Sequence, residues 1–88
     1  MGSLKIFTKA RCPKCPAAKE IGTKLKKEGV SVLQYDLDTT DGLAEASFYG
    51  ILSTPSLIIE DEEETEVISW RGVVPTIQEV RDHLPSGR

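Results

Sequence analysis

Phe7-Thr8-Lys9-Ala10-Arg11-Cys12-Pro13-Lys14-Cys15 joins a predicted strand to a predicted helix, and this junction decides the fold. The strand covers residues 4–8, and the helix extends to about residue 28. Small or apolar residues recur in the helix with the spacing i, i+3, i+4, i+7, at Ala18, Ile21, Gly22 and Leu25. Gly29 suits the left-handed position that follows a helix. The two cysteines therefore lie where a strand passes into a helix.

The rest of the chain continues to alternate between strands and helices. Residues 30–35 are rich in β-branched and aromatic side chains, which predicts a second strand. Residues 56–59 form a continuous apolar run of strand length, as expected where both faces of a sheet are covered. The polar residues 61–65 predict a turn, so residues 66–70 return as a fourth strand and complete a hairpin.

Two further helices are predicted from their capping residues. Asp41 is expected to cap a short helix that Gly50 ends. The apolar residues of this helix include Leu43, Ala44 and Phe48. Thr76, followed three residues later by Glu79, has the spacing of a capping box, and the helix it begins stops at Pro85. One face of this last helix carries Ile77, Val80 and Leu84.

The resulting order, β-α-β-α-β-β-α, predicts a single α/β domain over residues 1–88, with residues 1–3 and 86–88 frayed. The first strand and the second must be parallel, with a right-handed crossover through the helix between them. The last two strands form an antiparallel hairpin. We therefore expect a four-stranded mixed sheet with helices on both faces, which is the thioredoxin-like topology.

Composition narrows the class of protein. The net charge of -3 argues against nucleic-acid binding, which depends on positive charge. No apolar run approaches the ~20 residues of a membrane span, and residues 1–5 lack the apolar stretch of a secretory signal. With only two cysteines, a structural disulfide framework is not expected. We expect a cytoplasmic monomer that does not contact membranes.

The position of the cysteines suggests redox chemistry. Backbone N–H groups at the start of a helix have no partners within it and carry partial positive charge. A thiolate is stabilised there, and its pKa can fall well below about 8.5. Lys9, Arg11 and Lys14 add positive charge at the same end. We expect Cys12 to attack a substrate disulfide and Cys15 to act as the resolving thiol.

Two prolines shape this helix start. Pro13 suits the first helical position, where its missing N–H costs nothing. Pro16 would then fall at the fourth position and lose a hydrogen bond to the Cys12 carbonyl. We therefore expect either a local bend or a helix that starts one or two residues later.

Metal binding is the alternative use of such a cysteine pair. A zinc site needs two more ligands, but the chain has no third cysteine, and its single histidine, His83, lies on the last predicted helix. A metal or iron–sulfur cluster shared between two chains remains open. Two inert core thiols are a weaker interpretation, because charges and prolines flank them.

Three segments resemble the thioredoxin/glutaredoxin superfamily. Residues 7–15 are similar to the opening of glutaredoxins, where a lysine at the place of Lys9 helps bind glutathione or a peptide carboxylate. Residues 49–57 resemble the thioredoxin segment that ends in a cis-proline. Residues 70–75, Trp-Arg-Gly-Val-Val-Pro, are similar to the Trp-x-Gly-x-x-Pro segment of glutaredoxin-like redoxins.

The resemblance implies a small glutaredoxin-like redoxin that carries a thioredoxin-like cis-proline. A cis Thr54–Pro55 bond would leave the Thr54 backbone free to pair with an extended substrate segment. Trp70 and Gly72 are the further candidate substrate-binding residues, although Trp70 fits core packing at the end of a strand equally well.

The chain departs from both subfamilies. Ile6 stands where thioredoxins carry a buried aspartate, and Arg11 stands where they usually have a tryptophan. After Gly72 the chain lacks the second glycine and the acidic residues with which glutaredoxins hold glutathione. We therefore expect the electron donor to be a flavoprotein like thioredoxin reductase rather than glutathione.

The leading hypothesis is a thiol–disulfide oxidoreductase that reduces protein disulfides through Cys12-Pro13-Lys14-Cys15. It needs no cofactor beyond its own redox-active disulfide. A metal or iron–sulfur binding module that uses the same thiols across a dimer is the alternative, and an oxidase or isomerase is a third possibility.

Overall fold

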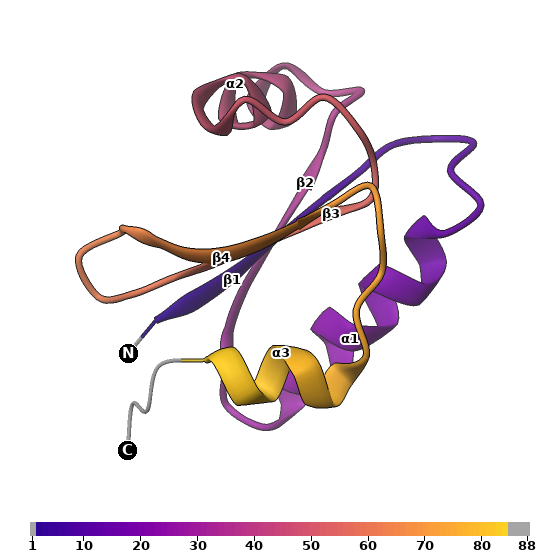
Figure 1. The fold of residues 1–88 in the computed structure, drawn as a ribbon. Coiled ribbons are helices and arrows are strands. Elements are labelled where there is room, and N and C mark those ends of the chain that lie inside the picture. Colours follow the sequence, from indigo (N-terminus) through magenta and orange to yellow (C-terminus); the bar gives the residue numbers. More distant parts are fainter. Residues whose placement is uncertain (1, 85–88) are drawn as a thin grey trace.

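The fold, seen in a computed structural model that describes residues 2–84, has the predicted order of elements (Figure 1). The strands and helices are β1 (Ser3–Thr8), α1 (Cys15–Lys27), β2 (Ser31–Asp36), α2 (Thr40–Tyr49), β3 (Ser56–Glu60), β4 (Glu66–Arg71) and α3 (Ile77–His83). Of the ends that we expected to fray, Ser3 is paired within β1. Residue 1 and residues 85–88, which include Pro85, lie outside the described residues.

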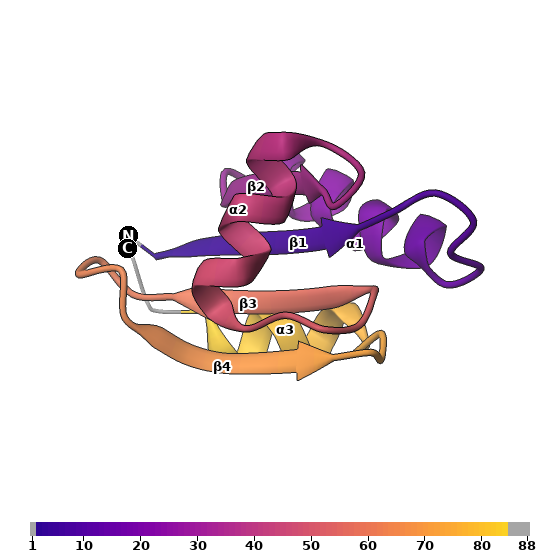
Figure 2. The ribbon, with the colours of Figure 1, turned by 90° about the horizontal axis from the view of Figure 1, so that it is seen from above.

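The four strands form one mixed sheet in the order β2-β1-β3-β4 (Figure 2). β1 is parallel to β2, whereas the β1–β3 and β3–β4 pairs are antiparallel. Ser56, the first residue of β3, pairs with Phe7 near the end of β1 and with Arg71 at the end of β4. The loops that follow β1 and β4 and the loop that precedes β3 therefore meet at one end of the sheet.

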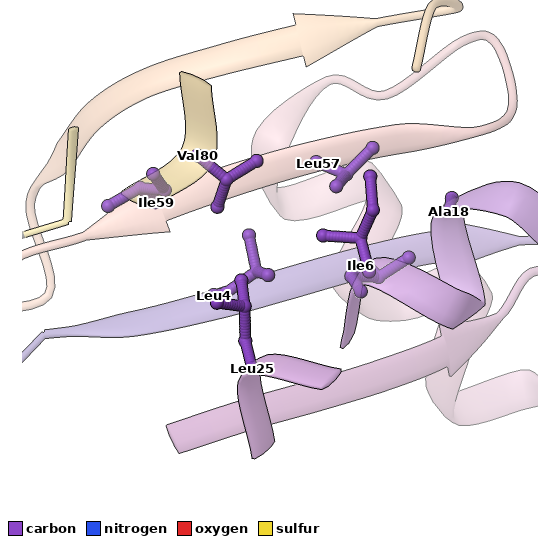
Figure 3. Packing of buried hydrophobic residues seen from close by; sticks show 8 residues of the cluster. Leu4, Ile6, Ala18, Leu25, Leu57, Ile59 and Val80 are labelled. Atoms are coloured by element: carbon purple, nitrogen blue, oxygen red, sulfur yellow. The ribbon is translucent and has the colours of Figure 1, made fainter. Parts of the chain in front are cut away.

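Helices cover both faces of the sheet, as predicted. α1 and α3 lie on one face and α2 on the other (Figure 1). The larger core lies under α1 and α3 (Figure 3) and consists of Leu4, Ile6, Ala18, Ile21, Leu25, Leu57, Ile59 and Val80. The smaller core lies under α2 and consists of Phe7, Ala46, Ile51 and Ile58. Every residue of β3 is buried, which explains the apolar run at residues 57–59.

The start of α2 differs from the prediction, and its apolar residues do not mark its buried face. Thr39, not Asp41, is the N-cap, and its hydroxyl accepts the Gly42 N–H at 3.0 Å. Leu43 and Phe48 are 55% and 80% exposed. The residues of α2 that are buried are Gly42 and Ala46. The helix approaches the sheet so closely that only small side chains fit between them.

The N-termini of α1 and α3 agree more closely with the predictions made from their proline and capping residues. α1 begins at Cys15 with Lys14 as its N-cap, so it starts late and Pro13 lies outside it. Pro16 then falls within the first turn, where no intrahelical hydrogen bond is lost. At α3, Thr76 and Glu79 form the predicted capping box.

Candidate active site

Cys12 and Cys15 form a disulfide, with their α-carbons 5.3 Å apart. A single turn holds them, because the Cys15 N–H donates to the Cys12 carbonyl at 3.2 Å. The preceding backbone is held by Asp38, whose carboxylate accepts the Ala10 N–H at 2.8 Å. Sequence reasoning did not find Asp38, which follows β2 at the same end of the sheet. The sulfurs are therefore fixed at the start of α1 by local and tertiary hydrogen bonds.

The two cysteines differ in exposure. Cys15, the first residue of α1, is only 3% exposed, whereas Cys12 is half-buried. The disulfide bond places the Cys12 sulfur directly beside that of Cys15. The first turn of α1 carries no acidic side chain. An approaching reagent therefore meets the Cys12 sulfur first, at the positive end of a helix.

Three cations flank the sulfurs. Lys9, Arg11 and Lys14 are all exposed, as their place in the loop predicts. Arg11 has a left-handed backbone with φ 61°, which turns the chain just before Cys12. Within residues 2–84, none of the three forms a hydrogen bond or ion pair through its side chain. The nearby Asp38 carboxylate, which accepts the Ala10 N–H, forms no ion pair with them.

The loop before β3 contains the cis Thr54–Pro55 bond that the resemblance implied. Pro55 is buried and Thr54 is half-buried. The Pro55 carbonyl accepts the N–H of Gly72 at 2.8 Å. Gly72 has φ 77°, and a Cβ there would lie 3.0 Å from Ser53 Oγ, so glycine suits both the backbone and the space. The structure thus brings Thr54, Pro55 and Gly72 together as neighbouring loops.

Arg71 connects these loops to α2. Sequence reasoning missed this role of Arg71. Its guanidinium donates to the carbonyls of Tyr49 at 3.1 Å and Gly50 at 3.4 Å, at the C-terminus of α2. It also forms an ion pair with Glu66 at 3.4 Å. A cation at a helix C-terminus is electrostatically favourable. Only its place in the Trp-Arg-Gly segment pointed to this residue, because the α2 carbonyls that it contacts lie more than 20 positions away in the chain.

Trp70 lies on the other side of the sheet from α2. It pairs with Leu57 across β3 and β4 and packs against the larger core. Its ring meets the His83 ring edge-on, with 5.7 Å between centroids. Of the two interpretations from sequence, the structure shows core packing. Two exposed apolar residues stand instead beside the candidate site: Leu52 is 97% exposed and Val73 is 49% exposed.

An ionic cluster under α2 was also missed. Lys5 Nζ lies 2.8 Å from Glu45 and 3.2 Å from Glu60, and it donates to the Tyr49 hydroxyl at 2.8 Å. Tyr49 in turn donates to Glu60. Desolvation lowers the pKa of Lys5, but its hydrogen bonds and attraction to the two carboxylates outweigh this and raise the pKa above its usual value. The sequence feature that could have indicated this cluster is a lysine placed between two core residues of β1.

Ile6 is fully buried in the larger core, at the place where thioredoxins carry an aspartate. Proton exchange with Cys15 therefore has no carboxylate at that position.

Among residues 2–84, no group of three or more His, Cys, Asp or Glu side chains could hold a metal ion. No helix in this part of the chain is both long and apolar enough to cross a membrane.

The chain matches the family model of the thioredoxin domain over residues 3–84. A probable thioredoxin of Archaeoglobus fulgidus is 40% identical over 63 residues, which cover 70% of this chain and 69% of the relative. A thioredoxin of Methanocaldococcus jannaschii is 27% identical over 62 residues, covering 69% and 73%.

Solved structures agree on the fold. Thioredoxin 1 of Thermosipho africanus superposes with a TM-score of 0.74 at 21% identity, covering 92% of this chain and 88% of its own. The family match spans nearly every described element, and the cysteine pair lies at the strand-to-helix junction within it. The chain therefore belongs to the thioredoxin family and has the disulfide centre of a thiol–disulfide oxidoreductase.

Proposed function

We propose that this protein reduces disulfide bonds in other proteins through Cys12 and Cys15. The observation that carries the proposal is the unequal exposure of two bonded cysteines at the start of α1. In the reduced protein, the Cys12 thiolate attacks one substrate sulfur. A mixed disulfide forms, and the other substrate sulfur leaves as a thiolate.

Cys15 completes the reaction. Its thiolate attacks the Cys12 sulfur of the mixed disulfide, which re-forms the internal disulfide and releases the second substrate thiolate. Two electrons pass from the dithiol to the substrate, and protons from water or substrate groups neutralise the thiolates. The burial of Cys15 supports this order of attack, because an external disulfide reaches the half-buried Cys12 first.

The surroundings of the sulfurs support thiolate chemistry. The positive end of α1 and the exposed charges of Lys9, Arg11 and Lys14 all favour the ionised form of Cys12. Pro13 lies outside the helix and lets the chain turn between the cysteines. These four residues are therefore assigned to tuning the reactivity of the Cys12 thiol.

A substrate segment needs a place to bind near the sulfurs, at the end of the sheet where the loop before β3 also lies. We assign its binding to the backbone of Thr54, in the manner of an added strand. The Pro55 carbonyl is already bonded to Gly72, so the loop is held in place from behind. The exposed side chains of Leu52 and Val73 offer apolar contacts on either side.

Two cysteine variants test the assignment. With insulin as a disulfide substrate, Cys12→Ser should abolish reduction because the attacking sulfur is missing. Cys15→Ser should stop turnover but accumulate a mixed disulfide, visible by mass spectrometry. Ser53→Ala, which keeps both sulfurs, is the matched control and should retain turnover. Full activity in both cysteine variants would refute the proposal.

The donor and the alternative function are tested in the same preparation. We propose that a flavoprotein like thioredoxin reductase, in the cytoplasm, re-reduces the disulfide. Supplying that enzyme with NADPH, or glutathione with glutathione reductase, shows which one reduces the oxidised protein. Anaerobic purification with metal analysis addresses the alternative, since a coloured or metal-loaded dimer without reductase activity would favour a metal or iron–sulfur module.

A further inference from the structure

Three basic residues lie beside the disulfide, at one end of the sheet. Lys9, Arg11 and Lys14 lie within three positions of a cysteine, at the end where β1 finishes. The acidic turn 61–65 connects β3 to β4 at the opposite end (Figures 1 and 2). Both ends also carry the opposite charge, because Asp36, Asp38 and Asp41 lie at the disulfide end and Lys24, Lys26 and Lys27 end α1 at the far end.

Ion pairing in the described part of the chain divides the cations into paired and unpaired ones. The cations of the strands and of α3 each meet a carboxylate: Lys5, Arg71 and Arg81. The three cations beside the cysteines have no such partner within residues 2–84, and neither do Lys19, Lys26 and Lys27 of α1. Asp38 is the acidic residue fixed beside this loop, and one of its oxygens is engaged by the Ala10 N–H.

We propose that Lys9, Arg11 and Lys14 form a basic rim that selects protein disulfides flanked by acidic side chains. This inference rests on the proposed function. Unpaired cations attract acidic partners before contact, and the acidic turn repels the same partners from the far end. A disulfide flanked by acidic side chains is therefore attracted to Cys12 by the adjacent cations.

Substrate selection by the rim must be distinguished from the effect of the same cations on the reactivity of the Cys12 thiol. A ratio of two substrates does this, because a change in the Cys12 thiolate affects both substrates equally. Two cyclic disulfide peptides are made that differ only in the four residues beside the disulfide, Glu in one and Lys in the other. The second-order rate constant for reduction is measured for each with the pre-reduced protein.

The acidic peptide should react about tenfold faster at low salt, at the lower end of the range known for electrostatic steering. At about 1 M salt, where the screening length falls to ~3 Å, the ratio should approach unity. A ratio near one at low salt would overturn the proposal.

A matched pair of triple variants locates the effect. Lys9→Gln/Arg11→Gln/Lys14→Gln removes the rim and should bring the ratio close to one. The control replaces three lysines of the last turns of α1 by glutamine: Lys24, Lys26 and Lys27. This control has the same net charge as the rim variant and should keep the ratio of the native protein.

The outcomes separate the two proposals. If both peptides are reduced at the same rate by the native protein, the disulfide reductase stands and the rim fails. If neither peptide nor insulin is reduced, the proposed function fails and the rim fails with it. If the control variant loses the ratio as fully as the rim variant does, net charge rather than the rim sets the preference, and the proposal is overturned.

Discussion

Replacing Lys5 by methionine should destabilise this protein strongly, although the residue lies outside the redox site. The Lys5 ammonium contacts Glu45, Glu60 and the hydroxyl of Tyr49 under α2. Its side chain is 12% exposed and that of Glu60 is 2% exposed. Methionine has a similar length but no charge. The change therefore leaves a buried carboxylate with only the tyrosine hydroxyl as its side-chain partner.

The magnitude follows from the burial of the two partners. Removing one partner of a buried ion pair costs about 3–5 kcal/mol, because the remaining charge stays desolvated. The 30% exposure of Glu45 lets water reach one side of the cluster, which favours the lower end of that range. A loss of about 3 kcal/mol lowers the melting temperature of a domain this size by roughly 12–24 °C. Against a total stability on the order of 4–13 kcal/mol, this is a large fraction.

The assay is urea unfolding of the oxidised protein at neutral pH, followed by circular dichroism. Lys24→Met is the matched control, because the Lys24–Glu20 pair is 59% and 67% exposed and such pairs contribute at most about 1 kcal/mol. A double variant, Lys5→Met/Glu60→Leu, should recover much of the loss by removing the stranded charge. A loss below about 1 kcal/mol in Lys5→Met, or no recovery in the double variant, would refute the reasoning.

Two further predictions concern pH and close packing. Because the pKa of Lys5 is raised above 10.5, its contribution is complete below that pH and is lost as pH rises through the folded-state pKa. The difference in unfolding free energy between the native protein and Lys5→Met should stay constant from about pH 7 to 10 and shrink above, and a decline already below about pH 9 would contradict this. Gly42→Ala should cost more than about 2 kcal/mol despite the higher helix propensity of alanine, because the new Cβ would collide with the Asp36 backbone. Gly29→Ala, which meets open space at φ 94°, should cost only about 1–2 kcal/mol in the same urea titration, and equal losses in the two variants would argue against the collision.

Local signals predicted the parts of the fold that depend on neighbouring residues. The apolar spacing of α1 and the capping box of α3 involve partners within a few positions, so they were visible in the sequence. The same holds for the cysteine pair and its surrounding cations. The cis Thr54–Pro55 bond was predicted only through resemblance to a family, since trans is the usual state of an X-Pro bond.

The errors occurred where distant segments decide the outcome. Leu43 and Phe48 were noted as apolar residues of α2, but the helix lies so close to β2 that Gly42 and Ala46 are the buried residues and both apolar side chains are exposed. Apolar character alone did not identify the buried side of this short helix, because the spacing available to it is set by the sheet.

The sequence by itself determined the order of elements, the place of the cysteines at a strand-to-helix junction and the positive charge around them. Only the tertiary structure decided which sulfur is more exposed, which cations are neutralised and which remain free. Burial and ion pairing depend on what the folded chain brings together from distant positions. Lys5 and Glu60 become partners across the sheet, whereas Lys9, Arg11 and Lys14 remain unpaired within the described residues.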